Sequence, residues 1–157
     1  RVAEAGHEVG NHSYKHENLP KLSQAGASQS LAKTNEILRK LSGQSVSLVR
    51  PPYGATSASV KAALQSQGQP SILWSIDTLD WKTRNSKSTI NTVLQHVKDG
   101  DVILRHSIYS QSADAAEVLI PALQERGFQL VTVSELAKAK GVDLQAGHNY
   151  GSFRKKG

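Results

Sequence analysis

The chain has 157 residues, of which 38% are hydrophobic and 20% are charged, and this composition excludes a disordered charged tail. No stretch approaches the ~18 consecutive apolar residues of a membrane span, so we expect no transmembrane segment in this chain. Cysteine is absent, which excludes disulfides and thiolate zinc sites and leaves His, Asp and Glu as metal ligands. The net charge of +6 fits either a basic surface or affinity for an anionic polymer, and the 5% of aromatic residues argues against nucleic acid as that polymer.

Short strands and helices alternate along the chain. Strands separated by helices are typical of parallel βα units, in an open sheet or in a barrel-like one. Apolar residues at helical spacing, ended by glycines or turns, predict helices at residues 23–42, 57–67, 88–98, 114–126 and 134–140, the last capped by Ser134. Short β-type runs predict strands at residues 7–11, 46–49, 72–76, 102–104 and 129–133.

The two ends of the chain differ from this pattern. The chain begins with Arg1 rather than Met, and residues 1–6 resemble the last turn of a helix that ends at a glycine. We therefore expect part of the fold to lie upstream of Arg1, and residues 1–141 to be an N-terminally truncated domain. Residues 142–157 are polar and basic, so we expect a surface tail, mostly irregular.

Polar side chains follow four successive predicted strands, where the functional loops of βα folds lie. His12 and His16 could share one divalent metal, or could be two exposed loop histidines. Arg50 opens a Pro-Pro loop and could orient a carboxylate or be a surface charge. Asp80 taken alone fits a turn residue, and His106 taken alone fits a buried structural histidine.

Taken together, these loops resemble the catalytic domain of the carbohydrate esterase family 4 polysaccharide deacetylases, the NodB homology domain. The resemblance covers roughly residues 1 to 140 and implies an α/β fold, the C-terminal part of a distorted (β/α)7-type barrel with about five parallel strands and five helices. The matching motifs stand in family order at residues 12–16 (HSYKH), 50–54 (RPPYG), 77–81 (DTLDW) and 103–106 (ILRH).

The sequence departs from the family pattern at three places. The first motif, TFDDGP, is missing, so the catalytic-base Asp and the third metal ligand, also an Asp, are expected upstream of Arg1. Ser107 stands where many members have Asp, and Arg105 stands where members often have an apolar residue. These two departures leave local loop geometry and substrate preference open.

The resemblance implies metal-dependent hydrolytic removal of N-acetyl groups from a cell-wall amino-sugar polymer, with peptidoglycan N-acetylglucosamine as the leading substrate. His12 and His16 would hold the divalent metal, most simply Zn²⁺, with Co²⁺ or another divalent ion as alternatives. Arg50 would keep the catalytic base ionised and aimed. The backbone N–H of Tyr53 would stabilise the oxyanion.

The later motifs would serve the leaving group and the acyl pocket. His106 would donate a proton to the leaving amine, with Asp80 beside it as its charge partner. Trp81 and Leu104 would line the pocket for the acetyl methyl group and a sugar face.

Three other functions fit the same residues. One is N-deacetylation of chitin or chitooligosaccharides, and another is O-deacetylation of acetylxylan, because both use the same kind of site. A third is an inactive glycan-binding fragment, because the first motif is missing. A separate N-terminal fragment of the same protein is a possible partner, and the family resemblance implies an extracellular or cell-surface, cell-wall-associated protein.

Overall fold

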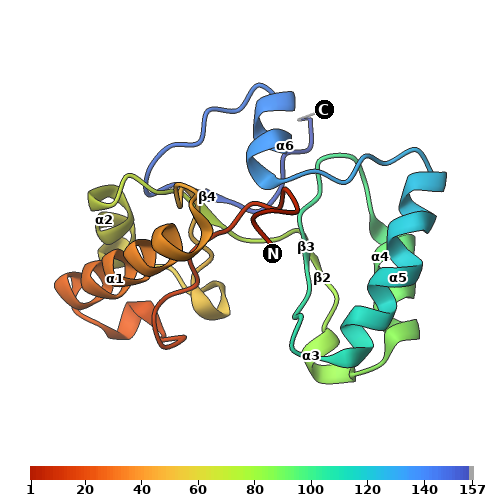
Figure 1. Cartoon of the computed structure of the whole chain (residues 1–157), viewed down its shortest axis with the longest axis horizontal. Helices are drawn as coiled ribbons and strands as arrows, with labels where there is room; N and C mark the ends of the chain where they lie inside the picture. The colour runs from red at the N-terminus through yellow and green to blue at the C-terminus, as the bar shows by residue number, and fades with distance from the viewer. Residues whose placement is uncertain (156–157) are drawn as a thin grey trace. The chain divides into compact units, whose positions relative to one another are not determined.

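The computed structural model describes residues 1–155 and consists of two compact units. The first unit comprises Arg1–Leu73 and Val142–Tyr150, and the second comprises Trp74–Gly141 and residues 151–155. Each unit contains helices and short parallel strands, so the predicted α/β class is confirmed (Figure 1).

Two helices that pack against each other form the body of the first unit, α1 (Gln24–Ser42) and α2 (Ala58–Ser66) (Figure 1). Ser23 caps α1 by accepting a hydrogen bond from the Gly26 N–H, and Gly43 ends the helix in the left-handed conformation with φ of 70°. These local signals explain why the predicted boundaries of α1 are confirmed to within one residue.

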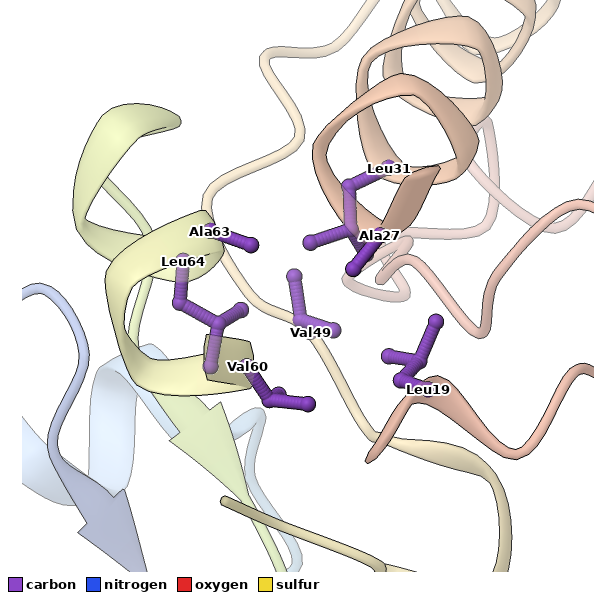
Figure 2. Packing of buried hydrophobic residues seen from close by; sticks show 7 residues of the cluster. All are labelled: Leu19, Ala27, Leu31, Val49, Val60, Ala63 and Leu64. Carbon is purple, nitrogen blue, oxygen red and sulfur yellow. The ribbon is translucent and has the colours of Figure 1, made fainter. Parts of the chain in front are cut away.

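The core of the first unit lies between these helices and the loop segments that approach them. Figure 2 shows apolar side chains of α1 and α2 converging on Val49, which is fully buried. Burying such a side chain stabilises a fold by about 1.5–3 kcal/mol. The cluster contains Leu19, Ala27, Leu31, Val49, Val60, Ala63 and Leu64; Leu19 belongs to a 3-10 turn, η1 (Leu19–Lys21).

A narrow parallel ladder runs through the first unit. Strand β1 (Ser71–Ile72) pairs in parallel with β4 (Asn149–Tyr150). Single parallel bridges extend the ladder from β1 to Val49 and from Val49 to Asn11. Because parallel strands end at the same edge, the residues that follow Asn11 and Val49 emerge on one side of the ladder.

The second unit packs helices against a two-stranded parallel sheet. Strands β2 (Ile76–Asp77) and β3 (Ile103–Leu104) pair with Ile76 opposite Ile103. Helices α4 (Ser86–His96) and α5 (Ser110–Glu125) pack against each other (Figure 1). The unit also contains the short helices α3 (Asp80–Thr83) and α6 (Val133–Ala139). Its buried core is formed by Ile76, Val93, Ala115, Leu119 and Leu123.

Several predicted strands are shorter than expected or absent. The strands predicted at 7–11 and 46–49 reduce to single bridges, and the one predicted at 72–76 is divided between β1 and β2. No strand forms at 129–133, where Leu130 and Val131 are 45% and 41% exposed. A strand needs a partner for its backbone groups, and the described residues supply none for this segment.

The start of α6 also differs from the prediction. Thr132, and not Ser134, is the N-cap: its hydroxyl accepts from the Glu135 N–H, and the Glu135 carboxylate accepts from the Thr132 N–H. This reciprocal pair is a capping box, which satisfies two otherwise unpaired backbone donors.

The described part of the tail expected at residues 142–157 is mostly irregular, but it does not lie wholly at the surface. Besides β4, the tail contains Phe153, which is 4% exposed and donates its N–H to the Gly100 carbonyl at 2.7 Å. A Cβ on Gly100 would lie 2.6 Å from the Phe153 backbone, so only glycine fits there. Lys156 and Gly157 lie outside the described residues. None of the described helices has the length and apolar character needed to cross a membrane.

Candidate active site

Asn11 fixes the loop that carries the two predicted metal ligands. Its side chain is 1% exposed and donates to the Leu31 carbonyl at 2.9 Å and to the Asn35 side chain at 2.7 Å, both on α1. Its side-chain oxygen accepts from the Ser13 N–H at 2.8 Å. One buried amide therefore ties the start of the loop to α1, a role that the sequence analysis did not predict.

The backbone of this loop adopts uncommon conformations. Ser13 and His16 have φ of 66° and 56°, in the left-handed region that non-glycine residues seldom enter. Such strain, of order 1–3 kcal/mol per residue, persists only where surrounding contacts hold it and clusters at functional sites.

Further hydrogen bonds converge on Glu17 at the end of the loop. Its carboxylate accepts from the Lys15 N–H at 2.9 Å and from the Ser30 hydroxyl at 3.2 Å. Desolvation raises the pKa of Glu17, but the hydrogen bonds from Ser13, Lys15 and Ser30 outweigh it and lower the pKa to about 2. The ionised carboxylate therefore links the end of the loop to Lys15 within the loop and to Ser30 on α1.

His12 and His16 are brought together at the surface of the first unit. Their ring centroids are 4.9 Å apart with an interplanar angle of 74°, and both side chains are exposed. His12 Nδ1 lies 2.5 Å from the Arg50 carbonyl oxygen. Because a carbonyl oxygen only accepts, Nδ1 carries the proton in this hydrogen bond, and the bond fixes the orientation of the ring.

This pair fits a divalent metal in part. A metal-binding His commonly donates its other ring N–H to a backbone carbonyl, which is the arrangement of His12 and Arg50. Among residues 1–155, however, no group of three or more His, Cys, Asp or Glu side chains is placed to hold an ion. The described residues therefore supply two nitrogen ligands and fit one part of a metal site.

The second motif flanks the histidine pair. The Arg50 guanidinium is half-buried and donates to the carbonyls of Ile72 and Leu73 at 3.3 Å each, and desolvation lowers its pKa. The Tyr53 ring packs edge-on against His16, with centroids 4.8 Å apart. Tyr53 has φ of 61° inside the 3-10 turn η2 (Pro52–Gly54) and is 68% exposed.

In the second unit, the buried Asp80 and the partly exposed His106 form a hydrogen-bonded pair. Asp80 is 2% exposed, and its Oδ1 lies 2.8 Å from His106 Nδ1. Its Oδ2 accepts from the His106 backbone N–H at 2.6 Å and from the Ser112 hydroxyl at 2.5 Å, while Oδ1 also accepts from the Trp81 N–H at 2.9 Å. With four donors, the carboxylate stays ionised although it is buried.

The pKa of Asp80 reflects this balance. Desolvation raises it, and the hydrogen bonds from Ser112 and His106, together with the charge of His106, outweigh the desolvation and lower it below the usual value. An ionised acceptor at Nδ1 makes that nitrogen the donor and directs His106 Nε2 away from Asp80. The His106 side chain is 35% exposed.

The remaining predicted residues lie around this pair. Trp81, on α3, is 47% exposed, whereas Leu104 is 7% exposed and belongs to β3. The Leu104 carbonyl accepts from the buried Thr78 hydroxyl at 2.8 Å. Leu79, with φ of 51°, is the N-cap of α3 and directly precedes the buried Asp80. Trp81 is thus available to a ligand, and Leu104 contributes chiefly backbone and core.

Two further residues bear on the pair. Ser112 lies in the first turn of α5, and nothing in its sequence context distinguishes it from any other helix serine. Arg105 departs from the family pattern; desolvation lowers its pKa and the charge of Asp80 opposes that effect. The Arg105 Nε is buried without a hydrogen-bond partner among the described residues.

The structure therefore groups the predicted residues into two sets. The first unit places His12 next to His16, with Arg50 and Tyr53 in contact with them. The second unit pairs Asp80 with His106.

Comparison with known proteins identifies what this arrangement is similar to. Residues 1–72 match the family model described as polysaccharide deacetylase. The peptidoglycan-N-acetylmuramic acid deacetylase PdaC of Bacillus subtilis is 43% identical over 141 residues, which cover 89% of this chain and 29% of that protein. The peptidoglycan-N-acetylglucosamine deacetylase PgdA of Listeria monocytogenes is 35% identical, over 96% of this chain and 31% of its own length. The chain thus spans about a third of the length of these two relatives.

Solved structures give the same match. The structure of PdaC from Bacillus subtilis superposes with a TM-score of 0.84 at 41% identity and covers 90% of this chain and 68% of that one. An acetyl xylan esterase from Clostridium thermocellum in complex with a cobalt ion superposes with a TM-score of 0.86 at 26% identity, over 97% and 75% of the two chains. A CE4 family pseudoenzyme from Bacillus anthracis matches with a TM-score of 0.83 at 28% identity, over 95% and 52%.

Proposed function

The chain belongs to the polysaccharide deacetylase family, and from this premise we propose that it takes part in metal-dependent hydrolysis of N-acetyl groups on a cell-wall amino-sugar polymer. The leading substrate is the N-acetylglucosamine of peptidoglycan. The observation that carries the proposal is the exposed pair of His12 and His16, with His12 oriented through its Nδ1 by the Arg50 carbonyl. Exposed imidazoles held in this way suit a ligand rather than a core.

In this proposal His12 and His16 would hold the divalent ion through their ring nitrogens. Zn²⁺ is the first choice, and Co²⁺ is the alternative that the cobalt-containing relative supports. When bound, this ion would supply Lewis-acid polarisation of the acetyl carbonyl. The family resemblance gives the third ligand and the catalytic base as aspartates of the missing first motif.

Two residues of the first unit would orient the catalytic base and stabilise the oxyanion. Arg50, held by two backbone carbonyls, presents a fixed guanidinium that would orient the carboxylate of the base. The backbone N–H of Tyr53, on the rigid turn after Pro51 and Pro52, would donate to the developing oxyanion.

The proton for the leaving amine would come from His106 Nε2. Asp80 holds the imidazole by its Nδ1, which leaves Nε2 as the only ring nitrogen free to deliver a proton. Trp81 would cover a sugar face with its exposed ring, and Leu104 would back the acetyl pocket.

A second function has a specific observation in its favour. Because residues 1–155 contain no group of three metal-ligating side chains, the chain taken alone would bind an ion weakly and would act as a glycan-binding fragment with negligible turnover. The pseudoenzyme among the similar structures shows that this fold exists in a form named for lacking activity. A separate N-terminal fragment would then be the partner that completes the site.

The place of action is part of the same proposal. A polymer of the cell wall is reached from outside the cell, so we expect an extracellular or cell-surface protein that associates with the wall. The net charge of +6 would favour contact with an anionic wall polymer.

An assay of acetate release distinguishes these alternative functions. The protein is incubated with peptidoglycan, chitin oligomers and acetylxylan, each with and without a chelator. We expect acetate from peptidoglycan, and its loss on chelation with recovery by Zn²⁺ or Co²⁺. Release from acetylxylan alone would replace the amidase assignment with esterase, and release that is insensitive to the chelator would remove the metal from the reaction. If residues 1–157 alone released acetate as fast as the same residues combined with the N-terminal fragment, the inactive-fragment alternative would be ruled out.

A further inference from the structure

A cation and an aromatic ring lie beside the Asp80–His106 pair and have no part in the proposed reaction. The central carbon of the Arg84 guanidinium lies 4.9 Å from the centroid of the Tyr109 ring. The Tyr109 ring lies in turn 6.4 Å from the His106 ring, and the Tyr109 N–H donates to the His106 carbonyl at 3.4 Å. The Tyr109 ring therefore contacts both the Arg84 guanidinium and the ring of His106, the proposed proton donor.

The backbone at Arg84 is strained to hold this side chain in place. Arg84 follows the last residue of α3 with φ of 44° and ψ of 41°, and its N–H donates to the Asp80 carbonyl at 2.9 Å. Glycine is the residue that ends helices in this conformation without strain. A long cation at such a position costs stability that a glycine would not, which is typical of a residue kept for what its side chain contacts.

The Arg84 guanidinium has no carboxylate partner among residues 1–155. The nearby Asp80 oxygens are occupied by His106, Ser112 and Trp81 donors, and Asp77 accepts from the Leu79 N–H at 2.9 Å. A guanidinium stacked on an aromatic ring keeps its edge N–H groups available, and this edge matches the two oxygens of a carboxylate.

We propose that Arg84 and Tyr109 form a subsite for a carboxylate that the polymer carries on the sugar next to the one deacetylated. This inference rests on the proposed function and narrows its substrate. Chitin carries no carboxylate, whereas peptidoglycan carries them on its peptide stems and, once the stems are removed, on the lactyl ether of muramic acid. The subsite would therefore favour peptidoglycan over neutral amino-sugar polymers.

The test compares charged and neutral substrates in matched variants. Arg84→Asn removes the guanidinium and keeps a residue that tolerates the left-handed conformation. Arg84→Lys keeps the charge but loses the planar donor edge. Lys87→Gln removes an exposed cation from the first turn of α4 and serves as the control. The values of kcat/KM are measured on chitotetraose, on peptidoglycan strands with stems and on strands stripped of stems by an amidase.

We expect Arg84→Asn to lower kcat/KM on carboxylate-bearing strands about tenfold, as for loss of one charge-assisted hydrogen-bonded pair. On chitotetraose its value should stay within about twofold of the unmodified protein, and the deficit should shrink at high salt. Arg84→Lys should recover part of the loss, and Lys87→Gln should change neither substrate. The strand that shows the larger loss identifies the stem or the lactyl carboxylate.

An equal loss on chitotetraose and on both strands would overturn the subsite while leaving the deacetylase proposal intact. Equilibrium binding of the stripped strands to the metal-free protein provides a readout without turnover. If no substrate yields acetate, the proposed function fails, and the subsite is then judged by binding alone. Weaker binding by Arg84→Asn than by Lys87→Gln supports it, and equal binding overturns it.

Discussion

The two units hold their candidate functional imidazoles in opposite ways. In the first unit, His12 and His16 are exposed, and their placement comes from a strained loop anchored by the buried Asn11 amide. In the second unit, His106 is held directly by Asp80, a buried carboxylate that accepts four hydrogen bonds. An ion-binding site needs solvent-accessible ligand atoms on a rigid backbone. A histidine that donates a proton needs an ionised carboxylate that fixes the orientation of its ring.

The largest effect should come from removing that charge. In Asp80→Asn an amide NH2 would face donors at His106 or Ser112, so the imidazole would lose its orientation. We expect kcat to fall ~10⁴-fold, as for other oriented histidines that lose their carboxylate, and the free energy of unfolding to fall as well. Steady-state acetate release measures the first effect.

Asp114→Asn is the matched control because Asp114 is an exposed carboxylate on α5. It should leave kcat within about twofold of the unmodified protein, in the range expected for a surface substitution. If Asp80→Asn retained kcat, the role of His106 as the oriented proton donor would be excluded.

The next effect should fall on the loop of the first unit. Asn11→Ala removes bonds to Leu31, Asn35 and the Ser13 N–H from a buried position, so we expect about 2–3 kcal/mol of lost stability. Urea denaturation measures it, with the exposed Asn91→Ala on α4 as the control. A loss no greater than that of the control would mean that the strained loop does not depend on Asn11.

Ser112→Ala should have a smaller effect on the second set. It removes one of the four donors to Asp80, and we expect about 1–2 kcal/mol, equivalent to roughly a tenfold loss of kcat. Ser112→Thr retains the hydroxyl and should recover most of the activity. A serine that is merely structural would lower stability in Ser112→Ala without changing kcat or its pH profile.

The smallest effect should be a pH dependence in the first unit. Because the pKa of Glu17 is lowered from 4.5 to about 2, its contribution to stability is present above pH 4.5 and is lost as pH falls toward 2. The group is partly solvent-exposed, so we expect no more than about 1 kcal/mol.

Comparing the free energy of unfolding of Glu17→Gln with that of the unmodified protein from pH 6 to pH 2.5 tests this. The difference should narrow as the solution is acidified, because the unmodified protein loses the contribution that the variant never had. A constant difference across this range would show that Glu17 is not ionised in this network.

Features encoded in short stretches of sequence could be predicted, and features set by distant partners could not. Ser23 and Gly43 mark the ends of α1 locally, and the spacing of His12 and His16 indicates their proximity. Strand β4 has two residues, too few for a periodic pattern, and pairs with β1 far along the chain. Ser112 donates to Asp80, 32 residues earlier in the chain, and this contact depends on the tertiary packing of α5 rather than on the local sequence.

At residues 129–133 the sequence predicts a strand that the structure does not form. Their β-type composition predicts a strand, but no described residue pairs with them, and Thr132 caps α6, which begins at Val133. Composition indicates that a segment can form a strand, whereas pairing depends on a neighbour that the composition does not reveal.

The central claim is that His12 and His16 share one ion, and anomalous diffraction from crystals of the protein loaded with Zn²⁺ or Co²⁺ tests it most directly. We predict one strong anomalous peak within about 2.0–2.2 Å of Nε2 of His12 and of a ring nitrogen of His16. A peak bound to only one of the two rings, or located away from both, would contradict the claim.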